Sequence, residues 1–261
     1  MRTDGPSLTA RIVAVHRAEL DRPSTPTGDP DGDDRLCTDL IDGFGDARDE
    51  VFGWVSARTR FFDAEILDAL AWGVRQVVIL GAGYDGRGLR FRAPGVSYFE
   101  VDHPNTQADK RERLDRLAID GDGIVFAPHD LAAGGLSPAL AGAGHDASRP
   151  TLFLAEGLLR YLPEATVQEV FGATRERSAP GSVLALTFST REDDAAVTHE
   201  TATREALLAD LGETVLTLPP RSTAFQWMAD AGWQGELVED VPTPGGDAGD
   251  GRLLIRATPI G

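Results

Sequence analysis

The stretch that decides the fold class is "RQVVILGAGYDGRGLRF", residues 75–91. Four apolar residues, 77–80, run directly into glycine at Gly81. A short apolar run that stops at glycine is typical of a buried parallel strand whose carboxyl end meets a nucleotide-like ligand. Together, Gly81, Gly83 and Gly86 match the G-x-G-x-x-G pattern of nicotinamide enzymes. A methyl-donor nucleotide needs nearly the same turn, so the glycines alone leave the ligand open.

The pattern of strands and helices continues on the carboxyl side of this stretch. We expect strands at 76–80, 97–102, 123–127, 151–156 and 182–188, and helices at 104–118, 134–143 and 163–178. Short apolar strands that alternate with helices predict an α/β fold with a doubly wound parallel sheet covered on both faces. A further helix is expected at 222–233 and a last strand at 251–258.

The remaining segments predict two additions to this core. Residues 7–20 and 49–72 have helical spacing, and the Pro-, Gly- and Asp-rich segment 21–35 between them predicts a loop. We therefore divide the chain into an N-terminal helical extension, 1–72, and a core, 73–261. Residues 190–218 do not fit the alternation and predict a lid insertion.

Composition narrows the choice of partners. A formal charge of −17 over 261 residues argues against nucleic acid and anionic membranes, because phosphate contacts need a basic face. Cys37 is the only cysteine, and the five histidines include no pair at metal-ligand spacing, so we expect no disulfide and no metal site. The first ten residues lack an apolar stretch, which favours a cytoplasmic protein. Lys110 is the only lysine among 25 basic residues, a bias typical of GC-rich bacteria.

Acidic residues at the strand ends favour a methyl donor over a dinucleotide. Asp102 ends the second predicted strand and can accept hydrogen bonds from ribose hydroxyls, as in both ligand classes. After the third strand, Asp130 can accept from an adenine amino group and Leu131 can contact the ring, although Asp130 also suits a turn or helix cap. Glu156 ends the fourth strand, where a carboxylate suits the cationic end of an amino-acid moiety and offers little to nicotinamide.

Several of these stretches also carry a family resemblance. Residues 75–91, "YFEVDHPNTQADK" (98–110) and "TLFLAEGLLRYLPEA" (151–165) resemble the leucine carboxyl methyltransferase family. Residues 56–67 and 225–233 resemble the segment before its first strand and its late helix. The resemblance implies a class I methyltransferase (Rossmann-like) fold and S-adenosylmethionine as cofactor.

The resemblance also implies roles for single residues. Arg58 matches an arginine that holds the cofactor carboxylate, and Tyr161 matches a tyrosine near the substrate pocket, where a packed core tyrosine is the alternative. The remaining matches are the first-turn residues Gly81, Ala82 and Gly83, the ribose acid Asp102, the adenine-side pair Asp130 and Leu131, and Glu156 beside the methionine moiety.

Two departures from the family pattern shape the functional hypothesis. Gly86 stands where the family has Thr, so the third glycine is a substitution and the nicotinamide pattern loses its weight. Ala132 stands where the family often has an Arg that we expect to hold a protein's C-terminal carboxylate. We therefore predict methyl transfer to a carboxylate or hydroxyl oxygen of a small molecule, by in-line displacement and with no catalytic base named. The alternatives are a protein C-terminal carboxyl methyltransferase and a cofactor-binding protein that has lost or changed methyl transfer.

Overall fold

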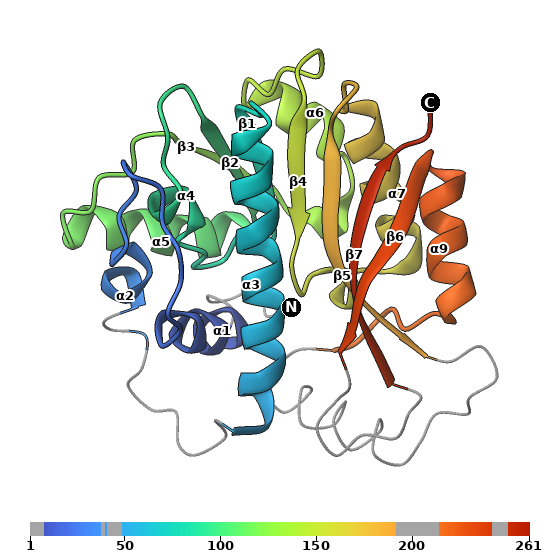
Figure 1. Cartoon of the computed structure of the whole chain (residues 1–261), viewed down its shortest axis with the longest axis horizontal. Helices are drawn as coiled ribbons and strands as arrows, with labels where there is room; N and C mark the ends of the chain where they lie inside the picture. The colour runs from blue at the N-terminus through green and yellow to red at the C-terminus, as the bar shows by residue number, and fades with distance from the viewer. Residues whose placement is uncertain (1–7, 38–39, 41–48, 192–213, 242–249) are drawn as a thin grey trace.

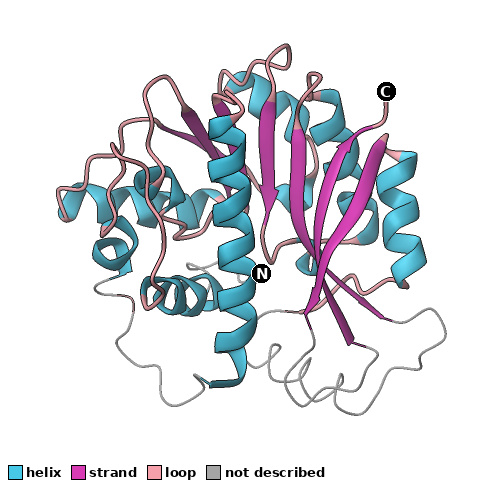
Figure 2. Cartoon of the chain, viewed as in Figure 1, coloured by secondary structure: helices cyan, strands magenta, loops and turns pink. Residues whose placement is uncertain are grey.

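The predicted fold class is confirmed by a computed structural model, which describes residues 8–37, 40, 49–191, 214–241 and 250–261. Its centre is a seven-stranded sheet of order β3-β2-β1-β4-β5-β7-β6, with helices on both faces (Figures 1 and 2). Strands β1 to β5 pair in parallel, and β7 lies antiparallel between β5 and β6. The strands are β1 Gln76–Leu80, β2 Ser97–Asp102, β3 Ile124–Pro128, β4 Thr151–Ala155, β5 Val183–Arg191, β6 Trp233–Val241 and β7 Asp250–Pro259.

The helices form two layers around this sheet. The long helix α3 crosses one face, which it shares with α4 and α5, while α6, α7 and α9 cover the other face (Figure 1). The helices are α1 Leu8–Ala18, α2 Gly32–Cys37, α3 Asp49–Ala71, α4 Arg87–Arg90, α5 Pro104–Arg116, α6 Leu136–Gly142, α7 Glu164–Glu176 and α9 Arg221–Asp230, with 3-10 turns η1 Leu131–Ala133 and η2 Leu159–Tyr161.

Side-chain alternation along β1 explains why its whole sequence is apolar. Val77 and Ile79 pack into the cluster that contains Phe62 of α3, whereas Val78 and Leu80 pack into the cluster on the opposite face. A strand buried on both faces needs apolar residues at every position. Because β1 pairs with β2 on one side and β4 on the other, the strand order reverses there. Ligands of such sheets bind at that switch point, outside the carboxyl ends.

Several predicted boundaries were wrong. The predicted loop 21–35 ends earlier, because α2 begins at Gly32. Strand β5 continues to Arg191, past the predicted start of the insertion at 190, and residues 192–213 of that insertion lie outside the described residues. Strand β6 was not predicted at all. The division of the chain at residue 72 stays a prediction, although α3 packs directly on the sheet.

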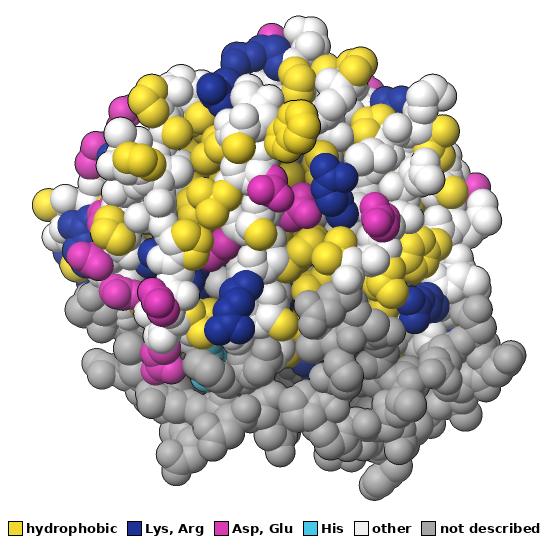
Figure 3. Space-filling view, viewed as in Figure 1, with side chains coloured by type: hydrophobic (Ala, Val, Ile, Leu, Met, Phe, Trp, Pro, Cys, Tyr) yellow, Lys and Arg dark blue, Asp and Glu magenta, His cyan; other side chains and the backbone are white. Residues whose placement is uncertain are grey.

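Two observations bear on nucleic acid and membranes as partners. On the face that α3 crosses, the described basic side chains are scattered among acidic and apolar ones (Figure 3). Among the described residues, no helix combines the length and the apolar character needed to span a membrane.

Candidate functional site

The turn after β1 has a backbone shape that requires glycine. Gly81 and Gly83 have φ angles of +65° and +49°, in the left-handed region that side chains disfavour. A Cβ atom at Gly81 would lie 3.0 Å from Leu158 Cδ1, and one at Gly83 would lie 3.0 Å from Ala10 Cβ. The amides of Gly81 and Ala82 both donate to the Val101 carbonyl, at 2.8 and 3.2 Å. The turn is therefore fixed against β2, and only glycine fits where Leu158 and Ala10 pack closely on it.

A Gly81→Ala variant is expected to bind S-adenosylhomocysteine about tenfold more weakly, because the methyl group is strained at positive φ and thickens the turn. Gly95→Ala is the matched control, since Gly95 has a φ of +72° and no atom within 4 Å of its hypothetical Cβ. Gly95→Ala should lose about 1 kcal/mol of stability in urea unfolding, and Gly81→Ala should lose somewhat more because its Cβ also crowds Leu158. Calorimetry should find weaker binding in Gly81→Ala alone, and equal weakening in both would contradict a ligand-facing turn.

Asp102 is held in place by backbone amides at the end of β2. Its Oδ1 accepts from the His103 amide at 2.6 Å, and its Oδ2 accepts from the Gly83 amide. Burial raises the pKa of Asp102, and the hydrogen bonds from Gly83 and His103 oppose that rise. The carboxylate is thus tied to the glycine turn, and the predicted hydrogen bonds from two neighbouring ribose hydroxyls to Asp102 stay a prediction.

Beside the turn lies a buried ion cluster, which in the described part of the chain comprises five arginines and four acids. Arg87 is its centre: Nε lies 2.8 Å from Asp63 Oδ1, and Nη1 lies 2.6 Å from Asp85 Oδ2 and 2.5 Å from Glu156 Oε2. Every member has a side chain less than a tenth exposed, and the members are Arg17, Arg22, Arg58, Arg87, Arg90, Asp33, Asp63, Asp85 and Glu156.

Glu156 joins three of these arginines at the end of β4. Its carboxylate lies 3.2 Å from Arg17 Nη2, 2.8 Å from Arg58 Nε and 2.5 Å from Arg87 Nη1. Burial alone would raise the pKa of Glu156, but Arg87, Arg17 and Arg58 together hold it well below its usual range. The acid is therefore ionised at neutral pH.

Within the ion cluster, guanidinium groups outnumber carboxylates. Among the described residues, five guanidinium groups face four carboxylates, so the cluster itself carries one positive charge in excess. The buried Nε atom of Arg17 makes no hydrogen bond in the described part of the chain, and Arg58 Nε, although 2.8 Å from Glu156 Oε1, makes none there either. Buried cations and donors without partners are costly, so this end of the cluster suits a ligand carboxylate. Glu156 beside it suits a ligand ammonium, and the donor set fits the amino-acid end of a methyl-donor nucleotide.

The predicted adenine-side residues lie further along the same edge. The His129 amide donates to the Asp102 carbonyl at 2.8 Å, which brings the end of β3 beside β2. Asp130 is exposed and caps η1, accepting from the Ala132 amide at 3.0 Å, which is the alternative that the sequence left open. The Leu131 side chain belongs to the core, so its backbone is what remains for a ligand. Contact of Asp130 and Leu131 with adenine stays a prediction.

Comparison with known proteins identifies the family. The sequence profile described as leucine carboxyl methyltransferase matches residues 38–175, about half of the chain. A protein from Mycobacterium bovis is 34% identical over 90% of this chain and 83% of its own length. The chain belongs to the leucine carboxyl methyltransferase family. The resemblance predicted from the sequence is thereby confirmed.

Other relatives are longer than this chain. A Mycolicibacterium smegmatis protein is 35% identical over 70% of the chain, which spans 61% of that protein's length. Both mycobacterial proteins carry the provisional name of S-adenosyl-L-methionine-dependent methyltransferase. These names support S-adenosylmethionine, the predicted cofactor, as the cofactor of the family. A crystal structure from Thermobifida fusca, described as that of a protein provisionally named a methyltransferase, matches this chain with a TM-score of 0.59 at 17% sequence identity. The match covers 98% of this chain and 96% of that one. That likeness shows the fold.

Within this family member, sequence analysis missed most of the ion cluster. Arg17 lies three residues after the buried Ala14 and so on the inner side of α1, but residues 12–15 are all apolar and do not indicate that side from sequence. Lys110, which the sequence left without a role in the site, is buried and hydrogen-bonded. Its Nζ donates to the Asp85 carbonyl and to Glu100 Oε2, both at 2.6 Å. Burial raises the pKa of Glu100 to about 7, and Lys110 opposes that rise. Lys110 thereby ties the glycine turn to β2.

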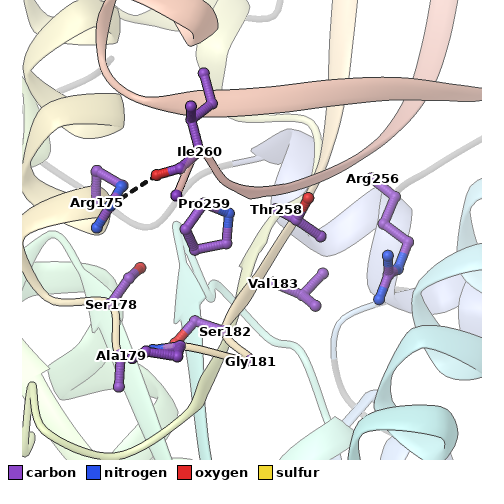
Figure 4. A pocket seen from close by; sticks show the side chains of 12 residues that line it. Arg175, Ser178, Ala179, Gly181, Ser182, Val183, Arg256, Thr258, Pro259 and Ile260 are labelled. Carbon is purple, nitrogen blue, oxygen red and sulfur yellow. Dashed lines mark hydrogen bonds between the residues drawn. The ribbon is translucent and has the colours of Figure 1, made fainter.

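A separate cavity of about 370 Å³ lies at the opposite edge of the sheet, between the start of β5 and the end of β7 (Figure 4). Its two arginines already have partners. Arg175 donates to the carbonyls of Gly232 and Ile260, and Arg256 pairs with Glu65. Because both arginines are engaged, the cavity offers a ligand no unpaired cation, and the carboxyl edge remains the candidate site.

Proposed function

We propose that this family member is a methyltransferase that binds S-adenosylmethionine and methylates a carboxylate or hydroxyl oxygen of a small-molecule acceptor. The observation that carries the proposal is the buried ion cluster with its excess positive charge, placed beside the glycine turn and Asp102. Such a site can bind the two ends of the cofactor through different interactions. The ribose hydroxyls need a fixed hydrogen-bond acceptor, and the amino-acid end needs a cation for its carboxylate and an anion for its ammonium.

Each part of the cofactor has an assigned partner in this proposal. The glycine turn admits the cofactor against its backbone, Asp102 binds the ribose hydroxyls, and Asp130 with Leu131 binds adenine. The methionine carboxylate is bound by Arg58 and Arg17, and its ammonium by Glu156. Bound S-adenosylmethionine supplies an electrophilic methyl group on a sulfonium sulfur.

The chain's own contribution is then to bind and align the reactants. In-line methyl transfer needs a short, collinear approach in a site without water, and it needs no covalent bond to the protein. A carboxylate acceptor is ionised at neutral pH and requires no base. We favour a small molecule over a protein C-terminus because Ala132, an exposed residue of η1, offers no cation where the family often has arginine.

The test is calorimetric titration of S-adenosylmethionine, S-adenosylhomocysteine and NADH into the wild type and Asp102→Asn. We expect micromolar affinity for the two sulfur nucleotides and none for NADH. Asp102→Asn should weaken both by about 100-fold, because a buried acceptor for two hydroxyls is lost. The exposed acid Asp120, replaced in Asp120→Asn, is the control and should bind like the wild type. Tight NADH binding, or an unchanged Asp102→Asn, would refute the proposal.

The acceptor class is tested with a labelled methyl donor. The protein is incubated with bacterial extract and S-adenosylmethionine that carries a labelled methyl group. Label in the small-molecule fraction supports the proposed acceptor, whereas base-labile label on protein would establish the protein carboxyl methyltransferase. S-adenosylmethionine binding without label transfer in any extract would favour a protein that has lost methyl transfer.

A further inference from the structure

Guanidinium groups and aromatic rings alternate along the carboxyl edge of the sheet. In this arginine–aromatic row, defined as Arg160, Tyr161, Arg58, Trp54 and Arg252, Arg160 Cζ lies 5.7 Å from the centre of the Tyr161 ring. The Trp54 ring has Arg58 Cζ at 6.0 Å and Arg252 Cζ at 5.4 Å. A Cβ atom at Gly157 would lie 3.1 Å from Arg58 Nη1, so Arg58 lies beside the chain that leads from Glu156 into η2.

The row begins at the proposed methionine site and leads away from it. Arg58 contacts Glu156, and η2, which holds Arg160 and Tyr161, follows Glu156 within five residues. Arg252 stands at the start of β7, paired with Ser189 near the end of β5. The row thus runs from η2, which follows β4, past α3 to the start of β7, beside the place where the cofactor's methyl end is proposed. An acceptor has to approach the methyl group from such a neighbouring surface.

Arg160 is the member of the row with capacity left for a ligand. None of the carboxylates in the described ranges forms an ion pair with Arg160, and its buried Nε atom makes no hydrogen bond there. Arg160 Cζ lies over the Tyr161 ring, a contact that uses no N–H donor of the guanidinium. A buried N–H donor without a hydrogen-bond partner is costly, and an anionic group of a ligand would satisfy the Nε donor of Arg160.

The backbone under Arg160 is also fixed. The Arg160 carbonyl accepts from the amides of Leu216 and Thr217, at 2.8 and 3.1 Å. Thr217 Oγ1 donates to the Leu162 carbonyl at 2.5 Å. These three bonds hold η2 against the segment that precedes α9. A charged side chain on a fixed backbone and stacked on a ring is preorganised, so little entropy is lost when it binds.

We propose that Arg160, stacked on Tyr161, binds a carboxylate group of the acceptor, so that the acceptor is an organic acid. The inference rests on the proposed function and names its substrate class. A planar guanidinium binds a carboxylate through two parallel hydrogen bonds, a geometry that a neutral amide or ester of the same shape cannot match. Arg160 thereby selects anionic acceptors, while the ion cluster holds the cofactor.

The experiment compares two probes of nearly equal shape, benzoate and benzamide. Each is titrated by calorimetry into protein saturated with S-adenosylhomocysteine. In the wild type, benzoate should bind about tenfold more tightly than benzamide, as expected for a charge-assisted hydrogen bond. Arg160→Gln should remove this preference by weakening the binding of benzoate alone. Arg160→Lys keeps the positive charge but cannot donate two parallel hydrogen bonds, so it should retain part of the preference. Arg149→Gln, at an exposed arginine of another loop, should keep the full preference.

The outcomes separate this inference from the proposed function. Equal affinity for benzoate and benzamide in a wild type that binds S-adenosylhomocysteine would overturn the inference alone. A preference that survives in Arg160→Gln would overturn it too. Loss of both probes in Arg160→Gln would mean that Arg160 supports the fold and does not select charge. A wild type that binds no S-adenosylhomocysteine would overturn the proposed function, and this inference with it.

Discussion

An Arg87→Met variant is expected to unfold with a free energy about 3–5 kcal/mol lower than the wild type, as is typical when one partner of a buried ion pair is removed. The Arg87 side chain is 1% exposed and contacts three carboxylates, those of Asp63, Asp85 and Glu156. Methionine fills much of the volume without the charge. The variant therefore leaves acids in the core with fewer partners, and that desolvation cost dominates.

The loss should also depend on pH. In the wild type, burial would raise the pKa values of Asp85 and Glu156, but the surrounding arginines hold both below their usual range. Their contribution is complete above the unfolded pKa values near 4 and fades as the pH falls below them. Without Arg87 both acids should take up protons more readily in the folded state. The difference between variant and wild type is therefore largest at neutral pH and shrinks towards pH 3.

Urea unfolding at several pH values measures both effects. Arg92→Met is the control, because Arg92 and Asp120 form a surface pair and should contribute less than about 1 kcal/mol. A double variant with Asp63→Asn should lose less than the sum of the two single losses, since it removes a charge together with its partner. A cost of Arg87→Met as small as that of Arg92→Met would show that the ion cluster contributes little to the fold.

The parallel strands could be predicted because strands that are buried on both faces have continuous runs of apolar residues in the sequence. The segment 76–80 was predicted with the bounds of β1, and 97–102 with those of β2. Strand β6 was missed because "WQGELVEDV" mixes acids with apolar residues, as an edge strand can. Four-residue α4 has too few positions to show a helical period.

The ion cluster could not be predicted for a different reason. Charged residues are mostly exposed, so nothing in "GRGLR" indicates that Arg87 and Arg90 are buried. Their partners Asp33 and Asp63 come from α2 and α3, and only the folded arrangement brings the four together. The predicted residues Arg58 and Glu156 do meet, as do Gly83 and Asp102. The Gly83–Asp102 pair follows from the rule that parallel strands end at one edge. Arg58 lies on α3 and was predicted only from the family resemblance, and the rest of the cluster depends on how the N-terminal segment packs.

A Glu156→Gln variant is expected to bind S-adenosylhomocysteine about 100-fold more weakly, because a charge-assisted partner of the amino-acid end is lost. The substitution also raises the excess positive charge of the ion cluster from one to two, since Arg17, Arg58 and Arg87 lose a shared carboxylate. The ribose side of the site is not touched by this change. Asp102 keeps its bonds from the Gly83 and His103 amides.

The assignment of Glu156 to the methionine end is tested with 5′-methylthioadenosine, which has the adenine, ribose and sulfur but no amino acid. Its affinity should change by less than about twofold in Glu156→Gln, whereas Asp102→Asn should weaken it and S-adenosylhomocysteine alike. Circular dichroism in the same buffer establishes that each variant is folded. If Glu156→Gln weakened both ligands equally, the acid would serve the fold as a whole and the division of the site into two ends would be wrong. A loss confined to S-adenosylhomocysteine would place the methionine ammonium at Glu156, between the glycine turn and the arginine–aromatic row that leads to the acceptor.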